Sequence, residues 1–193
     1  MYSLQTSVEI GQASFKIRNK GDFRVVLDCF EILHDSTLTS TDKTICSLFV
    51  FYEDFKNIQD VIEQADLWED LSAAMYKFFN GGEDNVESNT GGYNLVDWVK
   101  DSNLICSAIN SMLRQEIRSM DYLHWWTFLS YYNALGECPF SVIVSIRYKI
   151  AKGIKLEKHE RKFRQENPEY FNIDFRSEKQ KAAEEYVKNL WGG

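Results

Sequence analysis

The sequence predicts a mainly helical protein, a helical bundle that carries a small N-terminal β-hairpin. Hydrophobic residues make up 44% of the 193 residues and aromatic residues 15%, which is enough for a packed core and excludes general disorder. The chain contains only 2 prolines, and this scarcity favours long uninterrupted helices. Apolar residues also recur three and four positions apart along most of the chain, the spacing that buries one face of a helix.

The first 18 residues predict the hairpin. Val8 and Ile10 alternate with polar residues before Gly11, and Phe15 and Ile17 do so after it. Such alternation on both sides of a glycine is typical of two short antiparallel strands. Because two strands alone are only marginally stable, we expect the hairpin to pack on helices or to join the strands of a partner.

Helices are predicted for the remainder of residues 1–80, the N-terminal domain. Each is located by a polar residue that can cap its first turn and by apolar residues at helical spacing behind it. The predicted caps are Asp22 for the first helix, Thr41 or Asp42 for the second, and Asn57 or Asp60 for the third, which should continue to about Phe79.

A glycine-rich segment divides the chain. Residues 81–92 read GGEDNVESNTGG, so two Gly-Gly pairs enclose a polar stretch, which predicts a flexible linker or loop. The division leaves residues 93–165 as a C-terminal helical region that contains His124-Trp125-Trp126-x-Phe128, which we call the HWWxF box. Residues 166–193 then form a charged C-terminal helix, after a break at Asn167-Pro168.

Glycine and proline set the expected limits of the later helices, because glycine commonly follows a helix end and proline suits a first turn. The expected helices run through Trp98 to Leu113, from about Ser119 to Leu135 with Gly136 as C-cap, from Pro139 to Gly153, over the basic stretch 155–165, and over 177–191.

Two adjacent tryptophans stand out in the Ser119–Leu135 helix. Neighbouring residues of a helix point about 100° apart, so Trp125 and Trp126 cannot both be buried on one narrow stripe. The helix is therefore either central, with more than one face covered, or it presents a tryptophan to a partner. We expect one tryptophan to anchor the C-terminal helices and the other to lie nearer a surface that a partner could use.

Charge is distributed unevenly. The formal net charge is −7, yet residues 147–164 hold eight Lys or Arg against two Glu, and the first 146 residues carry −11. The acidic body argues against general nucleic-acid binding, although the basic stretch keeps that option open locally. We expect the basic stretch to be a solvated helix face or a contact for the acidic body. No apolar run reaches about 18 residues and no signal-peptide pattern begins the chain. We therefore expect no membrane span and a cytoplasmic location.

The sequence contains no motif of a known catalytic or cofactor site. It lacks GxxxxGK[ST], GxGxxG after a strand, HExxH and GxSxG. The four cysteines form no CxxC pair and the three histidines are isolated, which favours reduced, buried thiols over a metal site. His124 is more typical of a hydrogen-bonded structural histidine than of a catalytic base. We expect neither an enzyme nor a cofactor.

Several short motifs occur in the order found in one phage family. They are Glu9-Ile10-Gly11, Phe15-Lys16-Ile17, Asp22-Phe23-Arg24, Asp97-Trp98, Leu123-His124-Trp125-Trp126-x-Phe128, Pro139-Phe140, Ile143-x-x-Ile146-Arg147 and a basic helix from Lys158 to Arg164. Over roughly residues 8–165 the chain resembles the bacteriophage gene-product-fifteen family, and the HWWxF box is the most specific of these motifs. The segment after Asn167 has no counterpart in this pattern.

The resemblance implies a non-enzymatic tail assembly chaperone of long-tailed phages and prophages, working in the host bacterial cytoplasm. Its implied partners are the tape-measure protein and the tail-tube protein, and self-association is a further expectation. Trp, Tyr and Arg dominate binding hot spots. The candidate partner-binding residues are Trp125, Trp126, Phe128, Tyr131 and Arg147. The alternative for the aromatic members is a place in the core.

Two other functions stay open at this point. A structural virion component, such as a connector or tail adaptor, would use the same helices as permanent interfaces. A phage regulator would instead bind a host protein. The presence of the chain in purified virions, or the partner it retains in a pulldown, separates these alternatives.

Overall fold

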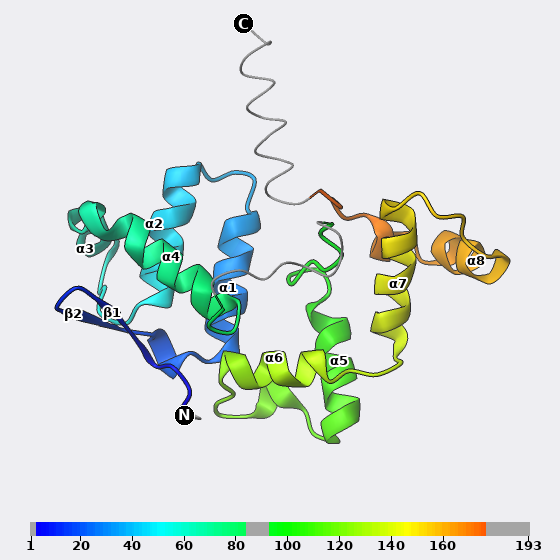
Figure 1. The fold of residues 1–193 in the computed structure, drawn as a ribbon, viewed down its shortest axis with the longest axis horizontal. Coiled ribbons are helices and arrows are strands. Elements are labelled where there is room, and N and C mark those ends of the chain that lie inside the picture. Colours follow the sequence, from blue (N-terminus) through cyan, green and yellow to red (C-terminus); the bar gives the residue numbers. More distant parts are fainter. Residues whose placement is uncertain (1–2, 84–92, 177–193) are drawn as a thin grey trace, which may run out of the picture. The chain divides into compact units, whose positions relative to one another are not determined.

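The computed structural model describes residues 3–83 and 93–176, and this part of the chain is mainly helical (Figure 1). An antiparallel hairpin comes first, made of β1 (Ser7–Ile10) and β2 (Ala13–Lys16). The α-helices are α1 (Phe23–His34), α2 (Ser40–Phe51), α3 (Ile58–Glu63), α4 (Trp68–Phe79), α5 (Ser102–Leu113), α6 (Trp125–Asn133), α7 (Pro139–Ala151) and α8 (Lys158–Glu166). Short 3₁₀ helices are η1 (Arg18–Lys20), η2 (Ala65–Leu67), η3 (Ile117–Ser119) and η4 (Pro168–Phe171). The predicted fold class is confirmed.

The chain forms two compact units. The first comprises residues 1–86 and 113–134, and the second comprises residues 87–112 and 135–193. This division differs from the predicted boundary at 81–92, because the segment with the HWWxF box groups with the N-terminal helices. Residues 84–92, within the predicted linker, and the predicted helix at 177–191 lie outside the described residues.

In the first unit, the hairpin packs on the end of α2. Val8 pairs with Phe15 across the strands, and both side chains are buried. The Phe15 ring lies 5.9 Å from the ring of Tyr52, in an edge-to-face arrangement. Gly11 makes the turn with a φ of +59°, a left-handed conformation that glycine adopts without strain. Packing on helices is therefore how this hairpin compensates for its small size.

The core of the first unit is aromatic. In Figure 1, α2 lies beside both α1 and α4. Phe51 of α2 makes edge-to-face contacts with Phe78 and Phe79 at the end of α4. The Tyr52 hydroxyl donates to the Leu71 carbonyl at 2.8 Å, so its polar atom is satisfied inside the core.

The predicted third helix is interrupted. Asn57 caps it as expected, with Asp60 completing a capping box, but α3 ends at Glu63 and α4 begins only at Trp68. The Trp68 indole donates to the Val61 carbonyl at 2.7 Å, a carbonyl that an unbroken helix would use internally. The Gln64 amide also donates to this carbonyl, at 3.1 Å, so the Val61 carbonyl has two donors where the helix breaks.

Other helix limits also differ from the prediction. The first helix is capped by Asp22 as expected, whereas the second begins at Ser40 behind Thr39. Trp98 lies in a turn before α5. The helix expected from about Ser119 to Leu135 spans only Trp125–Asn133, and its C-cap is Ala134, so the assignment of Gly136 was wrong.

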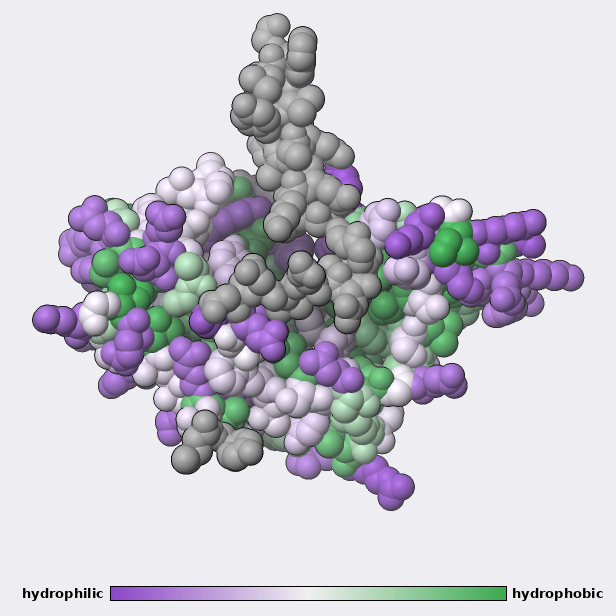
Figure 2. Space-filling view, in the orientation of Figure 1, coloured by the Kyte–Doolittle hydropathy of each residue, from purple (hydrophilic) through white to green (hydrophobic). Residues whose placement is uncertain are grey.

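The second unit has a smaller core. Ile143, Ile146, Leu156 and Phe171 form it, contributed by α7, the turn before α8, and η4. Pro139 occupies the first turn of α7 and Asn167 ends α8, both as predicted. The predicted basic helix is α8, and Figure 2 shows hydrophilic side chains projecting around it.

The four cysteines are free thiols, as expected. Cys29 and Cys106 are buried, and burial raises the pKa of the Cys29 thiol. Cys46 and Cys138 are only half-buried; Cys138 caps α7 by accepting a hydrogen bond from the Ser141 amide. Among residues 3–83 and 93–176, no helix is long and apolar enough to cross a membrane.

Candidate functional site

Two motifs that lie 100 residues apart in the sequence pair with each other in the first unit. The Phe23 amide donates to the Leu123 carbonyl at 2.9 Å, and the Trp125 amide donates to the Gly21 carbonyl at 2.8 Å. Asp22 and His124 thus form an isolated antiparallel bridge. The segments Asp22-Phe23-Arg24 and HWWxF therefore make one structural junction, and we call it the Asp22–His124 junction.

The carboxylate of Asp22 connects both sides of this junction. One oxygen accepts from the Arg24 amide at 3.0 Å and so caps α1, and the other accepts from the Leu123 amide at 2.9 Å. Burial raises the pKa of Asp22, but hydrogen bonds from Arg24 and from the Leu123 amide outweigh it, so that the net pKa is lowered. The group is held as a carboxylate that accepts hydrogen bonds.

His124 is the N-cap of α6. Its Nδ1 accepts from the Trp126 amide at 3.0 Å, and its Nε2 lies 2.9 Å from the Gln5 carbonyl. These two contacts require a neutral ring with its proton on Nε2. Burial, the largest effect, lowers the pKa of His124. The expected hydrogen bonding of this histidine is confirmed.

The junction predicts acid sensitivity. Because the folded-state pKa of His124 is lowered, its contribution to stability is complete above the unfolded pKa of about 6.5 and declines as the pH falls below that value. Protonation of Nδ1 would also remove the cap of α6. We expect the Tm of the wild-type protein to fall between about pH 7 and about pH 5.

Asp28 also has a raised pKa, caused first by burial and then by Glu31 and Asp22, so the wild-type Tm curve alone does not isolate His124. His124→Asn keeps a capping side chain but does not titrate, so the difference between the two Tm curves isolates His124. A difference that stays constant across this pH range would contradict the assignment.

The two tryptophans fix α6 on the end of α4. The Trp125 indole donates to the Phe79 carbonyl at 2.8 Å, and the Trp126 indole donates to the Phe78 carbonyl at 2.9 Å. The last carbonyls of a helix lack α-helical partners; the Phe78 carbonyl also accepts from the Gly81 amide at 3.0 Å, and the two indoles add donors at this end of α4. Trp125 is 0% exposed and Trp126 is half-buried. Contrary to expectation, Trp125 anchors α6 to N-terminal rather than C-terminal helices.

The structure separates the predicted partner-binding residues. Phe128 is buried and stacks on Phe23 at 4.9 Å and on Trp125 at 5.3 Å between ring centroids. Tyr131 and Trp126 are half-buried. The first unit thus brings four of the five residues onto one helix, with two in the core.

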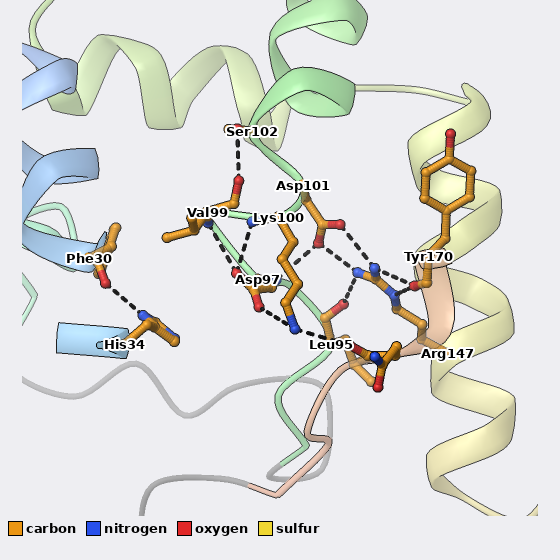
Figure 3. A network of polar contacts seen from close by, with 11 residues as sticks. Phe30, His34, Leu95, Asp97, Val99, Lys100, Asp101, Ser102, Arg147 and Tyr170 are labelled. Carbon is orange, nitrogen blue, oxygen red and sulfur yellow. Dashed lines mark hydrogen bonds and ion pairs between the residues drawn. The ribbon is translucent and has the colours of Figure 1, made fainter. Parts of the chain in front are cut away.

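The fifth, Arg147, belongs to the second unit and is 1% exposed (Figure 3). Its guanidinium makes two hydrogen bonds to the Asp101 carboxylate, at 2.6 and 2.9 Å, and three more to the carbonyls of Leu95 and Tyr170. All five N–H donors are therefore used. Arg147 joins α7 to the segment before α5 and to η4, which leaves no donor for a partner.

A surface groove in the second unit lies between α7 and α8. It has a volume of about 710 Å³. Its apolar lining residues are Val142, Ile146 and Phe163, and its acidic ones are Glu137, Glu160 and Glu166. Val142 is 49% exposed, so an apolar side chain of α7 is open to solvent at the groove. Lys149 pairs with Glu160 and keeps α8 against α7.

The family to which this chain belongs follows from comparison with known protein families. The family model described as Bacteriophage Gp15 protein matches residues 1–172. This chain belongs to the Bacteriophage Gp15 protein family. The resemblance deduced from the motifs is confirmed, and the family indicates a bacteriophage structural or assembly protein. No curated protein matches the chain, and no solved structure matches it either.

The groove of this Gp15 family member was not predicted from the sequence. Val142 lies on the same helix as Phe140, Ile143 and Ile146, but it is outside their buried stripe. Two features of the sequence could have indicated the groove. Val142 is an apolar residue on the polar side of a predicted helix, and Phe163 is the one aromatic residue in a charged helix. Among the described residues, no cluster of His, Cys, Asp and Glu is placed to hold a metal ion.

Proposed function

We propose that this protein is a non-enzymatic tail assembly chaperone that binds the tape-measure protein and assists tail-tube assembly in the host cytoplasm. The match to the Bacteriophage Gp15 protein family over residues 1–172 carries this proposal. A tape-measure protein is a very long, largely helical chain whose apolar stripes are exposed before assembly. A chaperone would cover such stripes with apolar grooves of its own.

The α7–α8 groove supports this mode of binding. Val142 and Phe163 give it an apolar surface, while Glu137 and Glu166 make its margin polar. An amphipathic helix binds such a groove through residues spaced three and four apart. The half-buried Trp126 in the first unit is a second, separate contact that a partner could use.

Purified virions test the first part of the proposal. A chaperone leaves the particle when assembly is complete, so we expect this chain to be absent from finished phage by mass spectrometry. Stoichiometric amounts in the particle would overturn the chaperone proposal and identify a structural component, such as a connector or tail adaptor. A pulldown that retains a host protein and no tail protein would identify a regulator.

Co-expression with a tape-measure fragment tests the groove. We expect the wild-type chain to increase the soluble fraction of the fragment and Val142→Glu to reduce that increase about tenfold, because a buried, unpaired carboxylate opposes docking of an apolar stripe. The soluble and insoluble fractions are compared by quantitative immunoblotting.

Val99→Glu is the matched control, since Val99 is also exposed in the second unit but lies outside the groove. It should rescue the fragment as well as the wild type does. Equal loss in the two variants would argue against the groove, and no rescue by the wild-type chain would argue against the chaperone.

A further inference from the structure

The second unit carries a basic surface that its own fold does not use. Residues 152–164 hold six Lys or Arg and two Glu. The inner side of α8 is occupied, because Glu160 pairs with Lys149 and Phe163 packs on Phe171. On its outer side Lys158, Arg161 and Arg164 are exposed.

These outer cations, together with Lys155 before the helix, make no ion pair among the described residues of the second unit. Ile154, which adjoins them, is 48% exposed. We call residues 152–164 the basic surface. Like charges at this density repel one another, so the surface gains from an acidic neighbour.

The first unit carries a surface of the opposite sign. Residues 53–70 hold seven Asp or Glu and one Lys, and we call them the acidic surface. Glu63, Asp66, Glu69 and Asp70 are exposed and make no ion pair among the described residues of the first unit. The inner side of this segment is buried through Phe55 and Val61, so the carboxylates are left to solvent.

The acidic surface also exposes apolar side chains. Ile58 is 39% exposed and Ile62 is 42% exposed, and they lie one turn apart on α3. Figure 2 shows hydrophobic residues among hydrophilic ones around this helix. Each surface thus combines uncompensated charge of one sign with exposed isoleucine, which is the composition of a polar, salt-sensitive protein interface.

The charge division extends to the whole units. The first unit holds 17 Asp or Glu and nine Lys or Arg, a net charge of −8, while the second holds 12 and 13, a net charge of +1. Two copies of the chain can therefore attract each other although both are acidic overall, provided that unlike units meet.

We propose that the acidic surface of one copy binds the basic surface of a second copy. The two surfaces differ, so the contact is heterologous and leaves one free surface of each kind on every pair. Further copies can then add, and the products are rings or filaments rather than a closed dimer. This association does not depend on the proposed chaperone function, because it requires no tail protein.

Sedimentation velocity of the full-length chain tests the proposal. At about 50 mM NaCl we expect the average mass to rise with concentration from the 22.6 kDa of one chain to more than about twice that value. At about 500 mM NaCl the charges are screened and the single chain should prevail. A mass that stays at one chain under all conditions would overturn the proposal.

Charge reversal tests whether the acidic and basic surfaces form the contact between copies. Lys158→Glu with Arg161→Glu, and separately Glu69→Lys with Asp70→Lys, should each abolish the rise in mass. An equimolar mixture of the two variants should form pairs of about twice the mass of one chain and nothing larger, since each variant retains only the surface that the other has lost.

Lys20→Glu with Arg114→Glu changes the net charge as much as the first pair does, but lies outside both surfaces, and it should associate like the wild type. Association that survives either reversal, or a mixture that stays monomeric, would show that these surfaces do not meet. Circular dichroism confirms that each variant is folded. Rescue of a tape-measure fragment by a wild-type chain that stays monomeric would leave the chaperone proposal intact while this one failed.

Discussion

Replacing Arg147 with leucine is expected to destabilise the second unit by about 3 to 5 kcal/mol, because the Asp101 carboxylate would remain buried without its cation. Two backbone carbonyls, of Leu95 and Tyr170, would lose their donors at the same time. Hydrogen exchange measures the effect locally. The amides of α7 should lose protection, while those of α1 and α2 in the first unit should keep it.

Two further variants refine this prediction. Arg147→Lys retains the charge but supplies at most three donors instead of five, so its loss should be intermediate. Arg118→Leu is the control, since Arg118 pairs with Glu116 at an exposed site, where such a pair contributes less than about 1 kcal/mol. Equal losses for Arg147→Leu and Arg118→Leu would show that the buried network does not stabilise the unit.

Replacing Trp125 with alanine is expected to lower the free energy of unfolding by about 3 to 5 kcal/mol, the usual cost of deleting a large buried ring. Trp125 contacts Phe128 and Phe30 through its ring and Phe79 through its indole N–H. The loss of all three should detach α6 from α4. Urea titration monitored by far-ultraviolet circular dichroism gives the free energy.

The neighbouring tryptophan is the natural comparison. Trp126 is half-buried, so Trp126→Ala should cost clearly less and leave the helical signal unchanged. Trp125→Phe keeps an aromatic ring and removes the hydrogen bond to Phe79, and it should cost about 1 kcal/mol. If Trp125→Ala and Trp126→Ala proved equally destabilising, the division between a core and a surface tryptophan would be wrong.

The candidate site shows where inference from the sequence stopped. Aromatic residues in the HWWxF box suggested a binding surface, yet Trp125 and Phe128 are buried. Arg147 uses all of its N–H donors in hydrogen bonds inside the second unit. Composition identified these residues as energetically important but could not tell packing within the chain from packing against a partner. Both uses select the same large, rigid side chains.

The sequence by itself determined the local elements. The hairpin around Gly11, the caps at Asp22 and Asn57 and the start of α7 at Pro139 could be read because each signal depends on residues a few positions apart. The tertiary structure alone decided that Asp22 meets His124, that the tryptophans close α4, and that Arg147 is buried. These contacts form because buried polar groups, at helix ends or on a side chain such as Arg147, must find partners, and those partners can lie anywhere in the sequence.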